Sequence, residues 1–241
     1  MESRLGPHLR KLGFKNFEDY LNFTLSSEGR DEFEYFITRI TTHTTSFFRE
    51  DSHFTYLFNH GINLLLRQFN PSCLNCMSLG ASTGEEAYSL ALVFMKYADL
   101  HKGFNFEIDL SDISSCSLKK AKNGEFKLSQ LSQIPKLYLP YIQKNNTWFT
   151  FIPAIKQRMS FFKLNICNPQ QRFPRTYHIV FCRNTLIYFS KEKQQIIMQN
   201  IERILKDGGL LFLGHSETLQ NIKCNLKKIR PTVYQKEIVD D

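Results

Sequence analysis

The sequence predicts an α/β protein with a doubly wound, mostly parallel sheet. An apolar segment at residues 76–79 ends in a glycine-containing loop, and a segment with the apolar spacing of a helix follows it. The order of strand and then helix recurs after residues 104–110, and a late helix leads into a strand at residues 210–213. Strands that alternate with helices in this way are typical of parallel sheets with helical crossovers.

The composition limits the size of the fold and its cellular location. A length of 241 residues fits one large domain, or one domain with a small companion, and 42% hydrophobic residues are ample for a core. No apolar run approaches the length of a membrane span, and the start of the chain has no apolar signal region. We therefore expect a cytoplasmic protein without membrane insertion.

Cysteines and charge give weaker indications. The six cysteines include one CxxC pair, Cys73 and Cys76, but no second pair at zinc-finger spacing, so we predict no metal. Cys76 and Cys182 stand inside apparent strands, where we expect buried free thiols. The formal net charge of +8 suggests an acidic partner, either a nucleic acid or an acidic protein surface. The lysines are spread along the chain, so the charge alone does not separate these two partners.

The first 45 residues are predicted to be helical. Apolar residues at helical spacing indicate short helices that begin at Pro7, at Phe17 and at Asp31, and we expect them to pack as a small cap on a larger domain.

A loop rich in threonine and serine follows at residues 41–46, because hydroxyl side chains favour hydrogen-bonded loops over helices. Phe47 and Phe48 would anchor this loop and hold Arg49 beside an apolar wedge. On composition alone, a helix-linking loop with a surface arginine is an equally good interpretation.

The rest of the chain alternates between predicted helices and strands. Ser114 and Gly124 are the capping residues that would begin and end the helix after the second strand. Residues 126–158 are irregular, with one short helical piece and an inserted hairpin built from residues 147–152 and the segment near Met159. A helix is expected at 54–69 and another from Ser190 to Gly208, with later strands at 161–165, 177–182, 210–213 and 233–238, the last one antiparallel at the far edge of the sheet.

The loop at residues 80–86 has the form of a ligand-binding turn. Gly80 and Gly84 allow positive φ and a close approach of the backbone to a ligand. In doubly wound folds this first turn meets the ligand at the carboxyl end of the strand. Glu85 and Glu86 argue against a phosphate, and the dinucleotide fingerprint and the Walker lysine are both missing. On this pattern alone, an ordinary strand-to-helix turn stays open.

Polar residues gather at the predicted ends of several strands, on the edge where such folds bind ligands. Glu86 and Asp112 are acidic, which suits a nucleoside that carries a positive charge and free ribose hydroxyls. S-adenosylmethionine has both a sulfonium and a ribose, so it fits this set. The set at this edge begins with Gly80 of the turn, and its polar members are Glu86, Asp112, Asn165, Arg183 and Asn184.

Several motifs make the chain similar to a known family. They lie at residues 42–50 (THTTSFFRE), 80–89 (GASTGEEAYS), 111–114 (SDIS), 181–189 (FCRNTLIYF) and 213–217 (LGHSE). On these motifs, nearly the whole chain resembles the CheR family, the glutamate methyltransferases of chemotaxis receptors. Each motif is predicted in its proper place relative to the strands, which makes the set highly specific.

The resemblance implies a division of the chain. It implies a small N-terminal helical domain at residues 1–50, shortened relative to the family, and an adenosylmethionine-binding methyltransferase domain at residues 51–241. An antiparallel β-subdomain is inserted in the second domain at about residues 126–160. Met1 falls inside the region that matches the family's basic, receptor-facing helix, so we expect either altered receptor recognition or a true start that lies further upstream.

The resemblance also implies a reaction and its residues. A methyl group passes from S-adenosylmethionine to glutamates on the cytoplasmic helices of chemotaxis receptors, giving γ-glutamyl methyl esters and S-adenosylhomocysteine. The active-site residues of the family fall on Arg49 and Tyr188. Together with Gly80 of the turn, the predicted cofactor contacts are His43, Thr45, Arg49, Glu86, Asp112, Asn165, Ile166, Arg183 and Asn184.

The chain departs from the family at two motif positions, and two alternative functions stay open. His43 stands where the family usually has asparagine, and Ala87 where it commonly has proline. The shortened N-terminus motivates one alternative, a sensing module that binds the cofactor without turnover. The net charge motivates the other, a nucleic-acid methyltransferase. Residues 183–186 (RNTL) argue against the latter, because amino-methylating enzymes of that class usually have Asn/Asp-Pro-Pro-aromatic there, so we expect no nucleic-acid partner.

Overall fold

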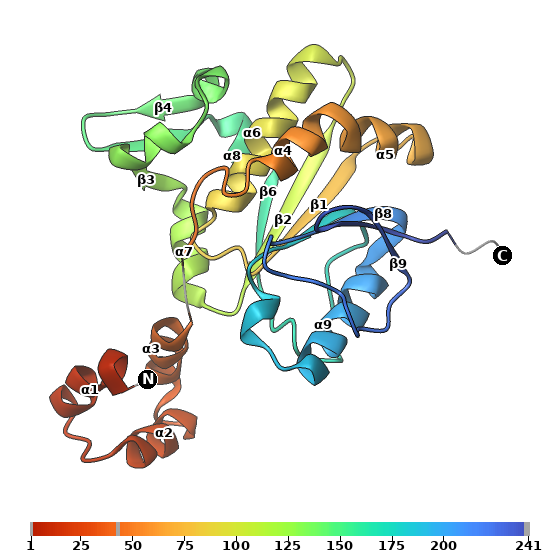
Figure 1. The fold of residues 1–241 in the computed structure, drawn as a ribbon. Helices are drawn as coiled ribbons and strands as arrows, with labels where there is room; N and C mark the ends of the chain where they lie inside the picture. Colours follow the sequence, from red (N-terminus) through yellow and green to blue (C-terminus); the bar gives the residue numbers. More distant parts are fainter. Residues whose placement is uncertain (1, 42–43, 239–241) are drawn as a thin grey trace.

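A mostly parallel sheet forms the centre of the molecule, which a computed structural model describes over residues 2–41 and 44–238. Its seven strands follow the order β6-β2-β1-β7-β8-β10-β9, and a separate antiparallel sheet has the order β3-β5-β4 (Figure 1). β6, β2, β1, β7 and β8 pair in parallel, whereas β10 is antiparallel to both β8 and β9. This arrangement confirms the predicted fold class. The strands are β1 (Leu74–Leu79), β2 (Phe106–Asp112), β3 (Glu125–Lys127), β4 (Ile142–Lys144), β5 (Trp148–Phe151), β6 (Met159–Lys163), β7 (Tyr177–Cys182), β8 (Leu205–Leu213), β9 (Leu226–Arg230) and β10 (Val233–Lys236).

Helices cover both faces of the large sheet. α4, α5 and α6 lie over one face and α9 over the other (Figure 1). Across residues 2–41 and 44–238, no helix is long and apolar enough to cross a membrane. The helical segments are α1 (Glu2–Lys11), α2 (Phe17–Leu25), α3 (Arg30–Ile40), α4 (Ser52–Tyr56), the π-helical turn η1 (Leu57–Gly61), α5 (Ile62–Phe69), α6 (Glu85–Leu100), α7 (Ser115–Asn123), the 3₁₀ segments η2 (Leu128–Gln133) and η3 (Lys136–Tyr141), α8 (Pro153–Lys156), the 3₁₀ turn η4 (Leu186–Tyr188) and α9 (Lys191–Ile204).

Alternate residues of the strands fill two apolar layers. Cys76, Ile108 and Phe181 belong to the cluster that includes side chains of α4, α5 and α6, whereas Met77 and Val180 belong to the cluster that includes side chains of α9. Successive side chains of a strand point to opposite faces of its sheet. The nearly continuous apolar strands of the sequence are therefore buried on both sides, as central parallel strands are.

The strands that follow β1 and β7 in the sequence lie on opposite sides of this pair in the sheet. The chain runs from β1 through α6 to β2 and later to β6 on one side, and β7 then lies on the other side of β1. The carboxyl ends of β1 and β7 therefore frame the topological switch point, where open α/β sheets bind their ligands.

The first helix begins earlier than the sequence predicts. α1 spans Glu2–Lys11 with Pro7 inside it, whereas we expected it to begin at Pro7. A proline at this interior position removes one intrahelical hydrogen bond and crowds the preceding turn, which works against the helix. Leu5 and Leu9, four residues apart on either side of Pro7, are both buried in the apolar cluster of α1–α3, and this burial favours a continuous helix.

α3 joins the N-terminal helices to the rest of the molecule. Figure 1 shows α3 beside α7, and the hydroxyl oxygens of Thr38 and Ser114 lie 3.0 Å apart between these helices. Glu34 of α3 forms an ion pair with Lys163 at the end of β6. The division into residues 1–50 and 51–241, with the insertion at about 126–160, stays a proposal.

The junction of α9 and β8 differs from the prediction. α9 ends at Ile204 and β8 begins at once with Leu205, whereas we expected the helix to continue to Gly208. Leu205 has an extended conformation and is paired with Tyr177, and the register between β7 and β8 shifts after this pair. Gly208, with φ +85°, therefore lies in a strand irregularity, a common position for glycine, and does not cap a helix.

Two edge strands were also predicted wrongly. Met159 begins β6 and pairs with Ile108 of β2, so this segment belongs to the large sheet and not to an inserted hairpin. β10 is not at the far edge, because β9 (Leu226–Arg230) lies outside it. β9 carries Lys227 and Lys228 in mid-strand, and charged residues that protect an edge strand also hide its apolar pattern in the sequence.

Stability is expected to fall as the pH is lowered from about 6.5 to 4, in part because of His178. Burial, helped by Lys206, lowers the pKa of His178 to about 4, and its Nδ1 accepts the Asn75 amide at 3.0 Å. Between these two pH values the unfolded chain binds the additional proton, so the contribution of about 3 kcal/mol is complete above pH 6.5 and is lost on acidification. His178→Asn keeps an acceptor but cannot titrate, so urea unfolding should show a smaller loss between pH 6.5 and 4. The same change at exposed His101 should leave the loss as in the wild type, and an unchanged loss in His178→Asn would contradict this assignment.

Candidate active site

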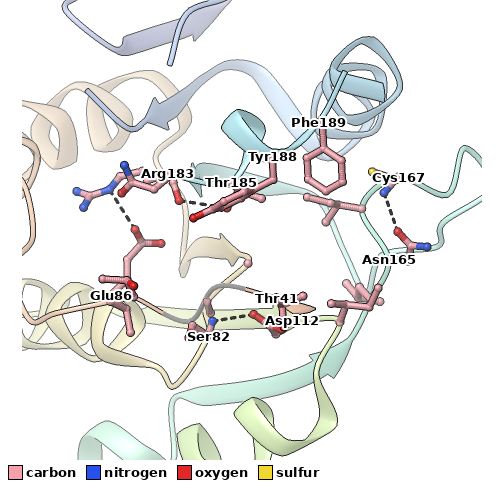
Figure 2. Close-up of a pocket in the computed structure, with 18 of the residues that line it drawn as sticks. Thr41, Ser82, Glu86, Asp112, Asn165, Cys167, Arg183, Thr185, Tyr188 and Phe189 are labelled. Carbon is pink, nitrogen blue, oxygen red and sulfur yellow. Dashed lines mark hydrogen bonds and ion pairs between the residues drawn. The ribbon is translucent and has the colours of Figure 1, made fainter. Parts of the chain in front are cut away.

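A cavity of about 660 Å³ lies at the carboxyl ends of β1, β2 and β7. Figure 2 shows Arg183, Thr185, Tyr188 and Phe189 on one side of it and Ser82, Thr41 and Asp112 across from them. The structure brings most of the predicted site residues around this one cavity, whereas His43 lies outside the described residues. The predicted residues that line the cavity are Thr45, Arg49, Gly80, Glu86, Asp112, Asn165, Ile166, Arg183, Asn184 and Tyr188.

Asp112 joins the turn after β1 to the end of β2. Its Oδ2 accepts the amide of Ser82 and its Oδ1 accepts the amide of Ser114, both at 2.8 Å. Each carboxylate oxygen has capacity for a further hydrogen bond. Asp112 can therefore hold the turn in shape and still offer acceptors to hydroxyl groups in the cavity.

Ser82 also presents an unsatisfied group to the cavity. Its side chain is buried, its φ is +51°, and its Oγ has no hydrogen-bond partner within residues 2–41 and 44–238. A buried hydroxyl without a partner is costly unless a ligand or water satisfies it. Together with the acidic residues, this unpaired hydroxyl fits a polar nucleoside ligand such as S-adenosylmethionine.

Gly80→Ala is expected to lower cofactor affinity, whereas Gly103→Ala is not. Both glycines have positive φ, +69° and +89°, so alanine should cost each about 1–2 kcal/mol of stability. Only at Gly80 does the new methyl group meet a neighbour, since it would lie 2.7 Å from Thr185 Oγ1. Calorimetric titration with S-adenosylhomocysteine and thermal unfolding of both variants measure the two effects. Equal affinities in the two variants would show that the contact between Gly80 and Thr185 does not shape the site.

Glu86 and Arg183 form an ion pair at one end of the cavity. Glu86 Oε1 accepts from Ser78 Oγ at 2.7 Å, and Glu86 Oε2 lies 3.1 Å from Arg183 Nε (Figure 2). That nitrogen is not aligned for a hydrogen bond, so the contact is an ion pair only. Burial raises the pKa of Glu86, and the charge of Arg183 opposes this rise. Arg183 offsets the negative charge of Glu86, so this end of the cavity is less negative than the sequence analysis predicts from Glu86 alone.

Arg183 also fixes the loop that carries Arg49. Its guanidinium donates to the carbonyl oxygen of Arg49, lies 3.1 Å from Nδ1 of His53 and is centred 5.3 Å from the ring of Phe54. The Arg183 side chain is 1% exposed, and both terminal nitrogens have a hydrogen-bond partner among the described residues, whereas Nε has the ion pair with Glu86. Arg183 is therefore better described as a support of the cavity wall than as an exposed charge.

Phe47 and Phe48 anchor the predicted loop. Both are buried, with the Phe47 ring 4.8 Å from Phe126 and the Phe48 ring stacked 4.9 Å from Tyr138. Arg49 follows them, is half-buried, and donates from Nη1 to the carbonyl of Thr44 at 2.9 Å. This bond uses one of the five guanidinium donors, so the others can bind a carboxylate.

The sequence reasoning did not name two acidic residues near the cavity. Glu50 accepts from Asn184 Nδ2 at 3.2 Å and from the amide of His215 at 3.1 Å, and it thereby joins the Arg49 loop to two later loops. Glu217 accepts backbone amides of residues 184–187. Both residues lie inside motifs that resemble the known family, at residues 42–50 and 213–217, and this position could have identified them as site residues.

One group of side chains has the spacing of a metal site. Ligand atoms of Glu50, His53 and His215 all lie within 4.8 Å of one another. The guanidinium of Arg183 lies against His53 Nδ1, and a fixed positive charge there opposes the binding of a cation. The prediction that the protein uses no metal stays a prediction.

Comparison with known proteins gives one consistent result. The family described as "CheR methyltransferase, SAM binding domain" matches residues 43–235. A chemotaxis protein methyltransferase of Borreliella burgdorferi is 33% identical over 243 residues, which cover 98% of this chain and 85% of that protein. The chemotaxis protein methyltransferases of Salmonella typhimurium and Escherichia coli are each 32% identical over 237 residues, covering 96% of this chain and 80% of each relative.

A solved structure of an O-methyltransferase family protein from Burkholderia thailandensis is 14% identical, with a TM-score of 0.43 over 88% of this chain and 50% of that one, and so remote a likeness says nothing about function. The family match spans most of the chain and confirms the predicted cofactor and the predicted class of enzyme. The chain therefore belongs to the CheR family, the S-adenosylmethionine-dependent chemotaxis protein methyltransferases, which are protein-glutamate O-methyltransferases.

Proposed function

We propose that this protein methylates glutamate side chains on the cytoplasmic helices of chemotaxis receptors and acts in the cytoplasm. The products are γ-glutamyl methyl esters and S-adenosylhomocysteine. The observation that carries this proposal is that Arg49 and Tyr188 line the same cavity as Glu86 and Asp112. A group that can hold a carboxylate is thus combined with groups that suit the methyl donor.

The proposed cofactor contacts come from several elements. Asp112 offers acceptors for the ribose hydroxyls, since both its oxygens are fixed by backbone amides and keep free lone pairs. Gly80 lets the turn approach closely, and Glu86 with Arg183 forms the polar end of the cavity. Thr45, Asn165, Ile166 and Asn184 complete the proposed set, and His43 belongs to it by resemblance alone.

The reaction needs little proton chemistry from the protein. S-adenosylmethionine supplies an activated methyl group on a sulfonium. A glutamate side chain has an ordinary pKa of about 4.3, so it is ionised at neutral pH and needs no general base. The protein's task is therefore to hold the carboxylate oxygen in line with the methyl group and to exclude water.

Arg49 and Tyr188 are proposed to position the incoming glutamate. Arg49 can hold the carboxylate by charge-assisted hydrogen bonds. Tyr188 is 57% exposed beside Ile187 at 49%, so this turn is open to an approaching receptor helix. Arg49 must bind the transition state better than the free carboxylate, because equal binding of both gains nothing in kcat.

Incubation with tritiated S-adenosylmethionine and receptor-rich membranes tests the function. We expect alkali-labile methyl label on the receptor, because methyl esters hydrolyse in base. Receptor whose modified glutamates are replaced by alanine is the matched control. Absence of label on any receptor, with cofactor binding intact by calorimetry, would contradict the enzyme and support a sensing module instead.

A further inference from the structure

Glu217 is a buried acid whose carboxylate is surrounded by backbone amides. It is 5% exposed and lies in the loop after β8. Its Oε2 accepts from the amides of Asn184 at 2.8 Å and Gly214 at 2.7 Å. Its Oε1 accepts from Thr185 and Leu186, both at 2.7 Å, and more weakly from Ile187 at 3.4 Å. Few arrangements satisfy a buried carboxylate so fully without a cationic side chain.

The backbone after β7 is shaped to receive this carboxylate. Asn184 has a φ of +53°, in the left-handed region, and Thr185 follows with a right-handed conformation. Successive amides in such a pair point to one concave side and form an anion-binding nest. Glycine at 214 lets its loop approach the turn closely, because a Cβ there would lie 2.8 Å from the backbone nitrogen of Asn184.

The turn held by Glu217 ends at Tyr188. η4 (Leu186–Tyr188) follows the nest directly, and the amide of Tyr188 donates to the carbonyl of Thr185 at 3.3 Å. More than half of the Tyr188 side chain is exposed, so packing alone does not fix its position. Glu217 holds the backbone of this short turn, which sets the point from which the Tyr188 side chain extends to the cavity.

A second residue supports the same turn from the other side. Gln194 of α9 donates through Nε2 to the carbonyls of Leu186 at 3.0 Å and Phe189 at 2.9 Å. Gln194 therefore satisfies acceptors of the turn, whereas Glu217 satisfies its donors. The side chain of Asn184 has its own bond to Glu50, so Glu217 is not its only restraint.

We propose that Glu217 is a positioning residue for methyl transfer, which orders the turn of residues 184–187 and so places Tyr188 against the reacting groups. This rests on the proposed function, in which Tyr188 contacts the glutamate or the methyl donor. Glu217→Gln keeps the size of the side chain but replaces one acceptor oxygen by a donor amide, which then faces backbone N–H groups. The turn loses its order while the rest of the cavity is retained.

The test measures activity and backbone order together. In Glu217→Gln we expect kcat on receptor to fall on the order of 100-fold, as a small misplacement of a positioned group does. The KM for S-adenosylmethionine should rise by a smaller factor, because Asn184 of the same turn is only one of several proposed cofactor contacts. Amide hydrogen exchange should be at least about tenfold faster over residues 184–187 and unchanged in β7. Glu202→Gln is the control, because Glu202 also accepts a backbone amide, that of Asn225 at 2.6 Å, but far from the turn.

A double-mutant cycle separates positioning from simple loss of stability. If Glu217 acts through Tyr188, then Glu217→Gln should lower the remaining kcat of Tyr188→Phe by less than about threefold, because coupled residues are not additive. A full 100-fold fall in both backgrounds, or unchanged exchange over residues 184–187, would overturn the proposal. Failure of the proposed function is distinct from this, since the wild type would then give no receptor label and Tyr188→Phe would have no activity to lose.

Discussion

Arg49→Ala is expected to lower kcat on receptor by about 10- to 150-fold, because a hydrogen bond to a charged group is worth roughly 1.5–3 kcal/mol. Phe47 and Phe48 hold the loop in the core, so removal of the arginine side chain should leave the cavity wall in place. Steady-state kinetics with labelled cofactor and purified receptor measure the effect. Arg49→Lys should recover only part of the loss, since an ammonium lacks the planar fork of donors that matches a carboxylate.

The control for Arg49 is an arginine of similar size away from the cavity. Arg67 is exposed near the end of α5, and Arg67→Ala should keep normal kcat. Normal activity in Arg49→Ala would show that Arg49 is a surface arginine of a linker and does not bind the substrate. An equal fall in both variants would point to a general effect of charge on receptor binding.

Asp112→Ala is expected to lower cofactor affinity by about 10- to 150-fold, again from the loss of charge-assisted hydrogen bonds worth roughly 1.5–3 kcal/mol. It should also destabilise the protein, because the amides of Ser82 and Ser114 lose their acceptors. Each buried amide left unpaired costs about 1–3 kcal/mol. Calorimetry with S-adenosylhomocysteine and thermal unfolding measure the two losses separately.

Asp207→Ala is the control for Asp112, since Asp207 is about half exposed and its side chain forms an ion pair with Lys236 away from the cavity. It should change neither cofactor affinity nor thermal stability appreciably, because exposed ion pairs contribute little. If Asp112→Ala loses stability but binds the cofactor normally, then Asp112 shapes the turn without touching the ribose.

Much of the candidate site could be predicted because it lies at strand ends. Local patterns place the strands, and a doubly wound sheet brings their carboxyl ends together, so Gly80, Asp112 and Asn184 could be grouped from the sequence. Capping chemistry is equally local. Ser114 does begin α7, its side chain accepting the amide of Ser117, and Gly124 ends it in the left-handed conformation.

The parts that escaped prediction depend on contacts between distant residues. Glu217 binds amides about thirty positions earlier in the chain, and Glu50 binds Asn184, which is 134 positions later. Nothing in the local sequence says which backbone groups a buried acid will meet. The inward packing of Arg183 against His53 is a similar case, because a charged residue at a strand end is expected to face the ligand.

α3 contributes to the cavity wall, so the binding of a ligand there is coupled to the packing of α3 against the rest of the molecule. Ile37 and Ile40 of α3 line the cavity, and α3 is held to the larger body by Thr38 and Glu34 through Ser114 and Lys163. A ligand that contacts both α3 and the strand ends would stabilise the packing of α3. By reciprocity, the packing of α3 would strengthen the binding of that ligand by the same free energy. Under the proposed function, contacts that hold α3 in place should therefore also tighten the binding of the methyl donor.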